Sequence, residues 1–238
     1  MSTGGVATVW LDRPEKGNAL SAEAVAALHA AVDAAIADES AHTLVIRGRG
    51  RHFCTGFDLS DLENETDASL RDRFVALERL LQAVWHAPMR TVAIATGRAW
   101  GAGADLFASC DIRAATPDVT LRFPGSAFGI VLGTRRLVEL IGWDRARPLV
   151  TEGATMDAVA ARAAELVTDI VEGDAADEWL ATRWGPPVAD RVTLAAIREA
   201  TRLDHRVADL ATLDQSASRP GLVTRIRKYR QGLTRARE

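Results

Sequence analysis

Cysteine, net charge and long hydrophobic runs are all scarce in this sequence, and each shortage excludes a class of protein. The two cysteines, Cys54 and Cys110, show no pairing pattern in a chain of 238 residues, which argues against a disulfide-stabilised secreted domain. A net charge of −3 gives no general attraction to nucleic acid or to an anionic membrane. No hydrophobic run approaches the roughly 20 residues of a membrane span, and the N-terminus lacks the features of a signal peptide. We therefore expect a cytoplasmic protein with no nucleic-acid or membrane partner.

Histidine is also sparse, and its placement gives no metal site. The histidines other than His52 show no metal-ligand spacing with a cysteine or a carboxylate, so we expect no metal. His52 precedes a glycine-rich segment and could act as a base, although an exposed loop histidine is the simpler interpretation.

Apolar segments, glycine-rich turns and helical periodicity alternate over the first 140 residues. Short apolar segments predict strands at residues 6–11, 43–47, 91–96, 111–115 and 119–123. Apolar residues at helical spacing predict helices at residues 22–37, 70–84, 104–110 and 134–141. Because strand, glycine-rich turn and helix occur in that order twice, the pattern indicates an α/β fold.

Beyond Gly142 the sequence becomes mostly helical. Its periodicity predicts helices at residues 157–165, 174–184 and 188–203, and the segment 222–237 is rich in basic residues. We predict an α/β core with its closing helices over residues 1–185 and a separate helical region over residues 186–238. The acidic run after Asp58 has no apolar periodicity, so we interpret it as a solvated, mobile loop.

The most informative segment is residues 91–111, where a buried strand leads through a glycine-rich turn into an apolar helix. Gly97, Gly101 and Gly103 let the backbone turn tightly or approach a ligand closely. The start of the helix leaves N–H groups unpaired, so an anion or a polarised carbonyl oxygen would bind there. Asp105 adds a carboxylate in the first turn of the same helix. We interpret this segment as one wall of an active site.

Gly101-x-Gly103 also matches part of a dinucleotide-binding pattern. No third glycine follows at the required offset, and Asp105 would repel a pyrophosphate. The dinucleotide interpretation is therefore disfavoured.

Four motifs occur in a fixed order along the core. They are Asp-Arg-Pro-Glu-Lys-Gly-Asn-Ala-Leu-Ser at 12–21, His-Phe-Cys-Thr-Gly-Phe-Asp-Leu at 52–59, Gly-Arg-Ala-Trp-Gly-Ala-Gly-Ala-Asp-Leu at 97–106 and Ser-Cys-Asp-Ile at 109–112. Each motif alone is a weak signal, but in order and spacing they together resemble the crotonase, or enoyl-CoA hydratase/isomerase, superfamily. The resemblance implies repeated β-β-α units that form two roughly perpendicular sheets, and a C-terminal helical region that assembles homotrimers or hexamers.

The resemblance also implies the chemistry. In this superfamily two backbone N–H groups, one from each glycine-rich loop, bind the enolate oxygen of an acyl-CoA thioester; by position these would be the amides of Phe57 and Ala102. One such donor is typically worth about 10²–10³ in rate, and a glycine turn and a helix start hold it without side-chain reorganisation. Coenzyme A would enter as the thioester substrate, with no further cofactor.

Further substrate contacts follow from the same resemblance. The residues implied to bind the CoA thioester are Lys16, Asn18, Ala19, Phe57, Asp58, Leu59, Trp100, Gly101, Ala102, Pro124 and Gly125. Lys16 is equally well explained as a solvated turn residue. Asp58 is more simply explained as an acceptor that anchors its loop.

Hydratases of this superfamily use two glutamates, and the sequence departs from that pattern at both positions. Asp105 occupies the first position, and Gly125, after Pro124, leaves the second without a carboxylate. We therefore predict an enzyme of the hydratase/isomerase group with Asp105 as a single acid/base, although an aspartate there is often only a helix-dipole partner. The alternatives are an isomerase, a thioester hydrolase, a decarboxylase or a catalytically silent acyl-CoA-binding homologue.

Overall fold

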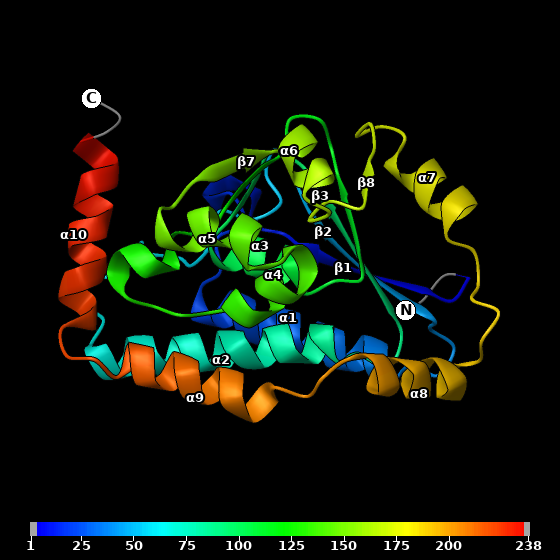
Figure 1. The fold of residues 1–238 in the computed structure, drawn as a ribbon, viewed down its shortest axis with the longest axis horizontal. Helices are drawn as coiled ribbons and strands as arrows, with labels where there is room; N and C mark the ends of the chain where they lie inside the picture. The colour runs from blue at the N-terminus through cyan, green and yellow to red at the C-terminus, as the bar shows by residue number, and fades with distance from the viewer. Residues whose placement is uncertain (1–3, 236–238) are drawn as a thin grey trace.

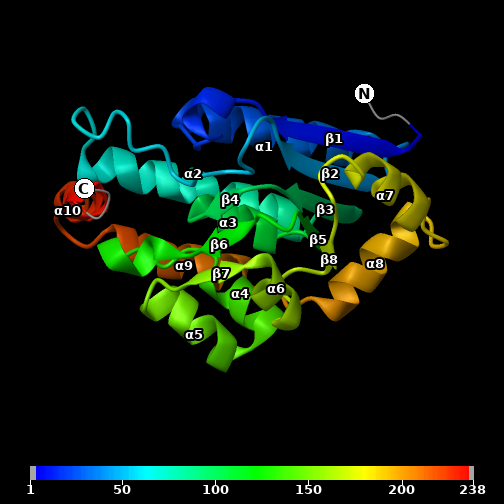
Figure 2. The same ribbon diagram turned by 90° about the horizontal axis from the view of Figure 1, so that it is seen from above.

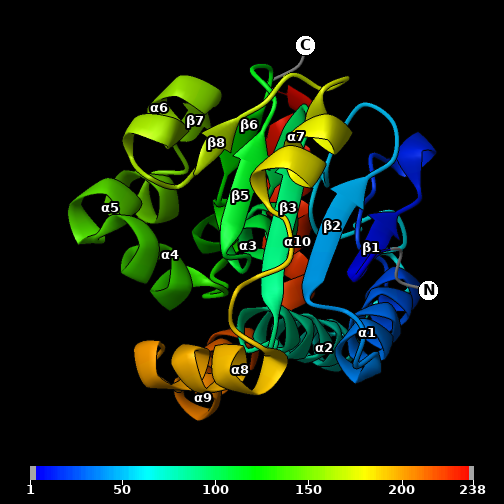
Figure 3. The same ribbon diagram turned by 90° about the vertical axis from the view of Figure 1, so that its right-hand side faces the viewer.

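The computed structural model describes residues 4–235, which form two β-sheets and a set of helices around them. The larger sheet is parallel throughout, in the order β1 (Val6–Leu11), β2 (Thr43–Gly48), β3 (Arg90–Ala95), β5 (Ile112–Ala115) and β8 (Asp169–Ile170). The smaller sheet contains β4 (Arg98–Trp100), β6 (Thr120–Arg122) and β7 (Thr155–Asp157), with β4 parallel and β7 antiparallel to β6. Figure 3 shows β1, β2, β3 and β5 side by side.

Both faces of the larger sheet are covered, which explains why its strands are apolar runs rather than alternating sequences. On β2, Leu44 and Ile46 belong to the main core, Val45 belongs to a second cluster, and all three side chains are fully buried. Trp179 of α7 (Ala176–Arg183) packs against that second cluster.

Helices surround the sheets and form both ends of the molecule. Residues of α1 (Ala22–Ala37), α2 (Asp67–Trp85), α3 (Ala102–Ala108) and α9 (Arg206–Ala217) belong to the main core, and α9 lies along α2 (Figures 1 and 2). The others are α4 (Thr134–Ile141), α5 (Trp143–Thr151), α6 (Ala158–Ala163), α8 (Arg191–Thr201), α10 (Leu222–Arg235) and the 3₁₀ helices Pro14–Lys16 and Pro124–Phe128. Figure 1 places α10 at one end of the molecule and α7 and α8 at the other.

The predicted α/β order is confirmed, with boundaries that shift by a few residues. The sequence pattern does not predict β4 and β7, because three residues are too few to show an alternation. It also misses α5, whose internal Pro148 interrupts helical periodicity. The helix predicted at 157–165 starts one residue later, since Asp157 ends β7 and caps α6 by accepting the N–H of Ala160 at 2.8 Å.

The acidic segment that follows Asp58 contacts the C-terminal helix, which its composition does not predict. Glu63 forms ion pairs with Arg227 and Arg230 of α10, each at 3.1 Å. Exposed pairs of this kind add little to stability. They nevertheless show that part of the basic C-terminal segment contacts acidic residues of its own chain.

A carboxylate from α2 caps the N-terminus of α10. Asp67 accepts hydrogen bonds from the N–H groups of Gly221 at 2.7 Å and Val223 at 2.9 Å. These bonds lower the pKa of Asp67, with that from Val223 contributing most. Leu222 and Ile226 are fully buried beneath the same helix. Because α10 also lines the cavity described below, this cap helps to position part of the site.

Replacing Asp67 with alanine should lower the free energy of unfolding by about 1 kcal/mol, the usual cost of losing a helix cap. Urea unfolding followed by circular dichroism measures the change. Asp67→Asn keeps an acceptor oxygen and is the matched control, with a smaller expected loss. Equal stability of Asp67→Ala and the unchanged protein would contradict this role for Asp67.

Candidate active site

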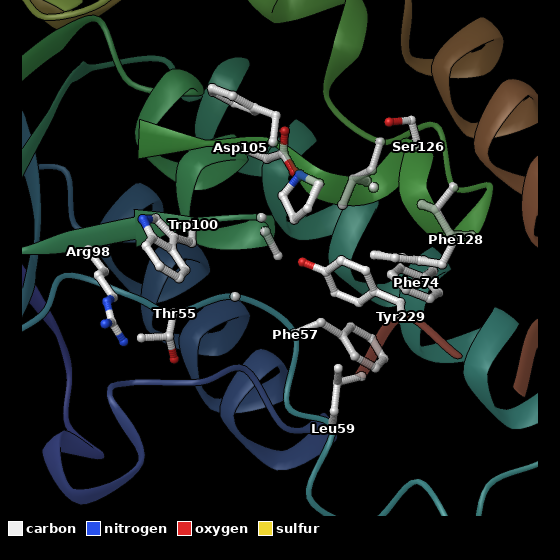
Figure 4. A pocket seen from close by; sticks show the side chains of 18 of the residues that line it. Thr55, Phe57, Leu59, Phe74, Arg98, Trp100, Asp105, Ser126, Phe128 and Tyr229 are labelled. Atoms are coloured by element: carbon white, nitrogen blue, oxygen red, sulfur yellow. The ribbon is translucent and has the colours of Figure 1, made fainter. Parts of the chain in front are cut away.

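A cavity of about 770 Å³ lies between the two glycine-rich segments, a size typical of small-molecule sites. Figure 4 shows labelled side chains from both segments, from α2 and from α10 around it. Its apolar lining includes Phe57, Leu59, Phe74, Trp100, Phe123, Phe128, Ile130 and Leu132. Its polar lining includes Lys16, Arg51, His52, Thr55, Arg98, Asp105, Ser126, Thr134 and Tyr229.

The two glycine-rich segments are joined by backbone hydrogen bonds where they enter the cavity. The N–H of Cys54 donates to the carbonyl of Arg98 at 3.0 Å, and the N–H of Trp100 donates to the carbonyl of Cys54 at 2.9 Å. Gly56 follows with φ +100°, and an ideal Cβ there would lie 2.7 Å from the carbonyl oxygen of Trp100. Only glycine fits this position, because any side chain would both strain the backbone and push the segments apart.

This arrangement leaves two amides free at the cavity. The N–H of Leu20 donates to the carbonyl of Gly56 at 2.8 Å, and the N–H of Asp58 donates to the carbonyl of Leu20 at 3.0 Å. The β-bridge between Leu20 and Phe57 is therefore made by the residues on either side of Phe57, and it leaves the N–H of Phe57 unused. Ala102 is the first residue of α3 and has no intrahelical acceptor for its N–H. Within residues 4–235 neither amide has a recorded acceptor, and both residues line the cavity.

The two amides also lie close to each other. An ideal Cβ on Gly56, the residue before Phe57, would be 3.6 Å from the nitrogen of Ala102. Two adjacent unpaired donors at a glycine turn and a helix start form a site for an oxygen that carries negative charge.

Asp105 places a carboxyl group on the same helix. Its own N–H donates to Gly101 at 3.0 Å, as expected in the first turn of α3. Gly133 packs against the side chain so closely that an ideal Cβ would lie 2.8 Å from the carboxyl carbon. Among the described residues none donates a recorded hydrogen bond to the carboxyl oxygens of Asp105, which line the cavity wall. Burial raises the pKa of Asp105 well above its usual range, and nearby Arg136 only partly opposes this.

Behind Asp105 lies a buried ion pair that the sequence analysis does not identify. Arg136 of α4 and Glu78 of α2 are 4% and 1% exposed, and a guanidinium nitrogen of Arg136 donates to Glu78 at 3.2 Å. Burial raises the pKa of Glu78 although Arg136 lowers it. The positive charge of Arg136 is therefore shared with Glu78, which limits its effect on Asp105. The sequence does contain a signal that Glu78 is buried, because Glu78 lies on the same face of its helix as the apolar residues Phe74 and Leu81.

The structure brings most of the sequence-predicted residues to one cavity. Those that line it are Lys16, Phe57, Leu59, Trp100, Gly101, Ala102, Asp105, Pro124 and Gly125. Asn18, Ala19 and Asp58 are outside the described lining of this cavity.

Asn18 and Asp58 instead hold the first glycine-rich segment in place. The amide of Asn18 donates to the carbonyls of Arg49 at 2.9 Å and His52 at 2.7 Å. Arg13 pairs with the carboxylate of Asp58 at 3.0 Å. Burial acts to raise the pKa of Asp58, but hydrogen bonds from Ser60 and Arg13 outweigh it and the pKa is lowered. Asp58 is thus an anchoring acceptor that stays ionised.

His52 also has a structural contact. Its Nδ1 accepts the N–H of Arg98 at 3.2 Å, at the start of β4. Burial lowers the pKa of His52, and Arg98 and Arg51 lower it further. The ring is therefore neutral and oriented by the backbone, which favours the non-catalytic interpretation.

A row of aromatic rings lines the cavity on the side of α2 and α10. Phe57 stacks on Phe74 at 4.3 Å, Phe74 lies 6.4 Å from Phe128, and Phe128 lies 5.1 Å from Tyr229. Only the last of these four carries a polar group. Sequence reasoning misses Phe74, Phe128 and Tyr229, because their common cavity depends on contacts between segments far apart in the chain.

Gly125 leaves little room for a side chain. An ideal Cβ there would lie 3.0 Å from the carbonyl oxygen of Ile130, a contact that the backbone would have to relieve. A second carboxylate at this position would thus require the segment to move.

Residues 4–235 contain neither a metal-ligand cluster nor a helix suited to a membrane. These residues contain no cluster of three or more histidine, cysteine or carboxylate side chains placed to hold a metal. None of their helices combines the length and the apolarity that crossing a bilayer requires.

Asp105→Asn should make stability less sensitive to alkaline pH. The folded protein holds a proton on Asp105 at pH values where the unfolded chain, with a pKa of about 3.9, has lost it. Stability of the unchanged protein therefore falls as pH rises through this window, whereas the amide does not titrate. We expect Asp105→Asn to match the unchanged protein near pH 4 and to exceed it in free energy of unfolding near pH 8. Parallel urea-unfolding curves at several pH values measure this, and a constant difference across pH would contradict it.

Comparisons with known proteins agree with this geometry. A family model described as enoyl-CoA hydratase/isomerase matches residues 2–218. A Bordetella parapertussis crystal structure, assigned as an enoyl-CoA hydratase/isomerase, superposes with a TM-score of 0.92 at 41% identity, covering 96% of each chain. A Mycobacterium tuberculosis protein assigned as an enoyl-CoA hydratase is 35% identical over 201 residues, 83% of this chain and 78% of that protein.

A second mycobacterial relative matches over a shorter span. The Mycobacterium leprae protein assigned as an enoyl-CoA hydratase is 38% identical over 152 residues, 61% of this chain and 60% of its own length. The α/β architecture with two sheets is the crotonase fold that the motifs imply. The chain belongs to the enoyl-CoA hydratase/isomerase family of the crotonase superfamily.

Proposed function

We propose that the chain is an enzyme that binds an acyl-CoA thioester in this cavity and moves a proton at the acyl carbon next to the thioester. The N–H groups of Phe57 and Ala102 donate hydrogen bonds to the thioester oxygen, and Asp105 is the acid/base. The observation that carries this proposal is a buried carboxyl group without a hydrogen-bonding partner in the described chain, one helical turn from a free amide in the same cavity.

The two amides would stabilise the enolate that forms when a proton leaves or joins the α-carbon. Charge on the thioester oxygen grows along that reaction, so fixed donors lower the barrier more than they strengthen substrate binding. Neither donor must reorganise, because Phe57 follows Gly56, which is packed against the carbonyl of Trp100, and Ala102 begins α3.

Asp105 suits proton transfer because burial raises its pKa towards the working range of an acid/base catalyst. In hydration of a 2-enoyl thioester, Asp105 would take a proton from water as the water oxygen bonds to C3. The π electrons move to the thioester as an enolate, which then re-forms the carbonyl and takes the proton from Asp105 at C2. Asp105 thus gains one proton and loses it again, and ends the reaction as the carboxylate with which it began.

The cavity has positively charged side chains of the kind that coenzyme A needs. Lys16, Arg51 and Arg98 line it, and phosphate groups bind favourably to such cations. Lys16 lies in the 3₁₀ helix Pro14–Lys16 beside the first glycine-rich segment. These cations support binding of the CoA phosphates at this cavity.

A catalytically silent acyl-CoA-binding homologue is the second candidate. The absence of a carboxylate at Gly125, together with the tight contact to Ile130, favours it. Isomerisation, thioester hydrolysis and decarboxylation would use the same two amides.

A homotrimer or a hexamer is part of the proposal. Val188, Val192, Leu203 and Val207, at or beside α8 and α9, have exposed side chains, and contact with other copies would cover them.

The proposed function predicts exchange of the C2 protons of butyryl-CoA with solvent deuterium, measured by NMR. The exchange rate should rise with pH through the raised pKa of Asp105, because the base must be ionised, and Asp105→Asn should abolish it. Ala102→Pro should slow it by about 10²–10³, since proline removes one oxyanion donor while remaining tolerated as the first residue of a helix.

Ala102→Gly keeps the N–H and is the matched control, with a far smaller expected loss. Calorimetric binding of butyryl-CoA separates the two candidates. Binding without exchange in the unchanged protein would favour the silent homologue, and absence of binding would overturn the proposed function.

A further inference from the structure

Tyr229 is a polar group of the cavity that the proposed function leaves unused. It is the only tyrosine of the chain, lies on α10 and lines the cavity with Asp105 and Ala102. Figure 4 shows its hydroxyl pointing away from the rings of Phe74 and Phe128, towards the centre of the cavity. Among the described residues no hydrogen bond to this hydroxyl is recorded, so it is available to a ligand.

The surroundings of Tyr229 fix its position. Its ring packs on Phe128 with centroids 5.1 Å apart. Arg225, one turn earlier on α10, donates to the carbonyl of Phe128 at 2.9 Å, and Ile226 is fully buried on the same helix. A side chain held from several directions can orient a small molecule without a large entropic cost.

Water addition at C3 needs a second polar group, because Asp105 alone fixes only one of the two protons of water. The position where the superfamily's hydratases carry their second glutamate is Gly125, which has no side chain and little space for one. Tyr229 supplies a hydroxyl to the same cavity from a different element.

We propose that the Tyr229 hydroxyl binds the oxygen that adds to C3 of an enoyl thioester, or leaves from C3 in the reverse reaction, and so takes the orienting role of the missing carboxylate. This assignment rests on the proposed function. It makes Tyr229 a catalytic residue for water addition and gives it no role in proton transfer at C2.

The chemistry leaves the phenol unchanged. The water molecule places one O–H on Asp105 and the other on the Tyr229 oxygen, its oxygen bonds to C3, and its first proton passes through Asp105 to C2. Dehydration uses the same contacts in reverse: the hydroxyl on C3 donates to the Tyr229 oxygen, Asp105 takes the proton from C2, and that proton passes to the departing oxygen, which leaves as water. Burial raises the pKa of Tyr229, although Arg122 opposes this, so the phenol stays protonated throughout.

Two reactions, hydration at C3 and proton exchange at C2, distinguish this proposal from a structural role for Tyr229. Tyr229→Phe keeps the ring and removes only the oxygen. In this variant the kcat for hydration of crotonyl-CoA should be about 10- to 100-fold lower, with little change in KM. This is the range for a hydrogen bond to a charged group, because the water oxygen gains charge as it bonds to C3. Deuterium exchange at C2 of butyryl-CoA should stay within about twofold of the unchanged protein, since this reaction involves no oxygen at C3.

Thr224→Val is the matched control, because it removes a hydroxyl from an exposed position of the same helix. It should leave both reactions unchanged. Retained C2 exchange in Tyr229→Phe also shows that the variant folds and binds its substrate.

Each remaining outcome has a distinct meaning. Hydration by Tyr229→Phe at the unchanged rate overturns the assignment, as does a parallel loss of hydration and exchange, which would mark a structural role. An unchanged protein that exchanges the C2 protons without hydrating crotonyl-CoA overturns the Tyr229 assignment and leaves the proposed function intact. Absence of both binding and exchange in the unchanged protein overturns the proposed function itself.

Discussion

The close approach of the two glycine-rich segments is the constraint on which the candidate site depends. Backbone hydrogen bonds from Cys54 to Arg98 and from Trp100 to Cys54 fix the segments side by side, and Gly56 allows a contact that any side chain would prevent. The free amides of Phe57 and Ala102 are a consequence of this packing. The site is thus made largely of main chain, and the surrounding side chains adapt it to a ligand.

The carboxyl groups around the cavity differ in their partners and in the direction of their pKa shifts. Asp58 is paired with Arg13 and keeps a low pKa, whereas Asp105 is buried, has no recorded hydrogen-bond partner within residues 4–235 and has a high pKa. Glu78 holds Arg136 as an ion-pair partner, so Arg136 only partly opposes the rise in the pKa of Asp105. Environment, rather than residue type, therefore separates the anchoring carboxylate from the candidate acid/base.

The sequence predicts local features of this molecule much better than distant contacts. Most strands and helices follow from periodicity. The cavity-lining residues Phe57, Ala102 and Asp105 follow from motifs that are contiguous in the chain and resemble those of a known family. Tyr229 could not be predicted, because only tertiary packing brings α10 beside the 3₁₀ helix Pro124–Phe128. The binding role suggested for Asn18 rested on motif position alone, and its contacts instead hold the loop.

A crystal structure of Asp105→Asn with butyryl-CoA would show whether the two amides hold the thioester oxygen. We expect the thioester oxygen about 2.7–3.2 Å from both the Phe57 and the Ala102 nitrogens, with the α-carbon beside residue 105. A thioester oxygen bound elsewhere, or two amides occupied by acceptors of the protein itself, would contradict it.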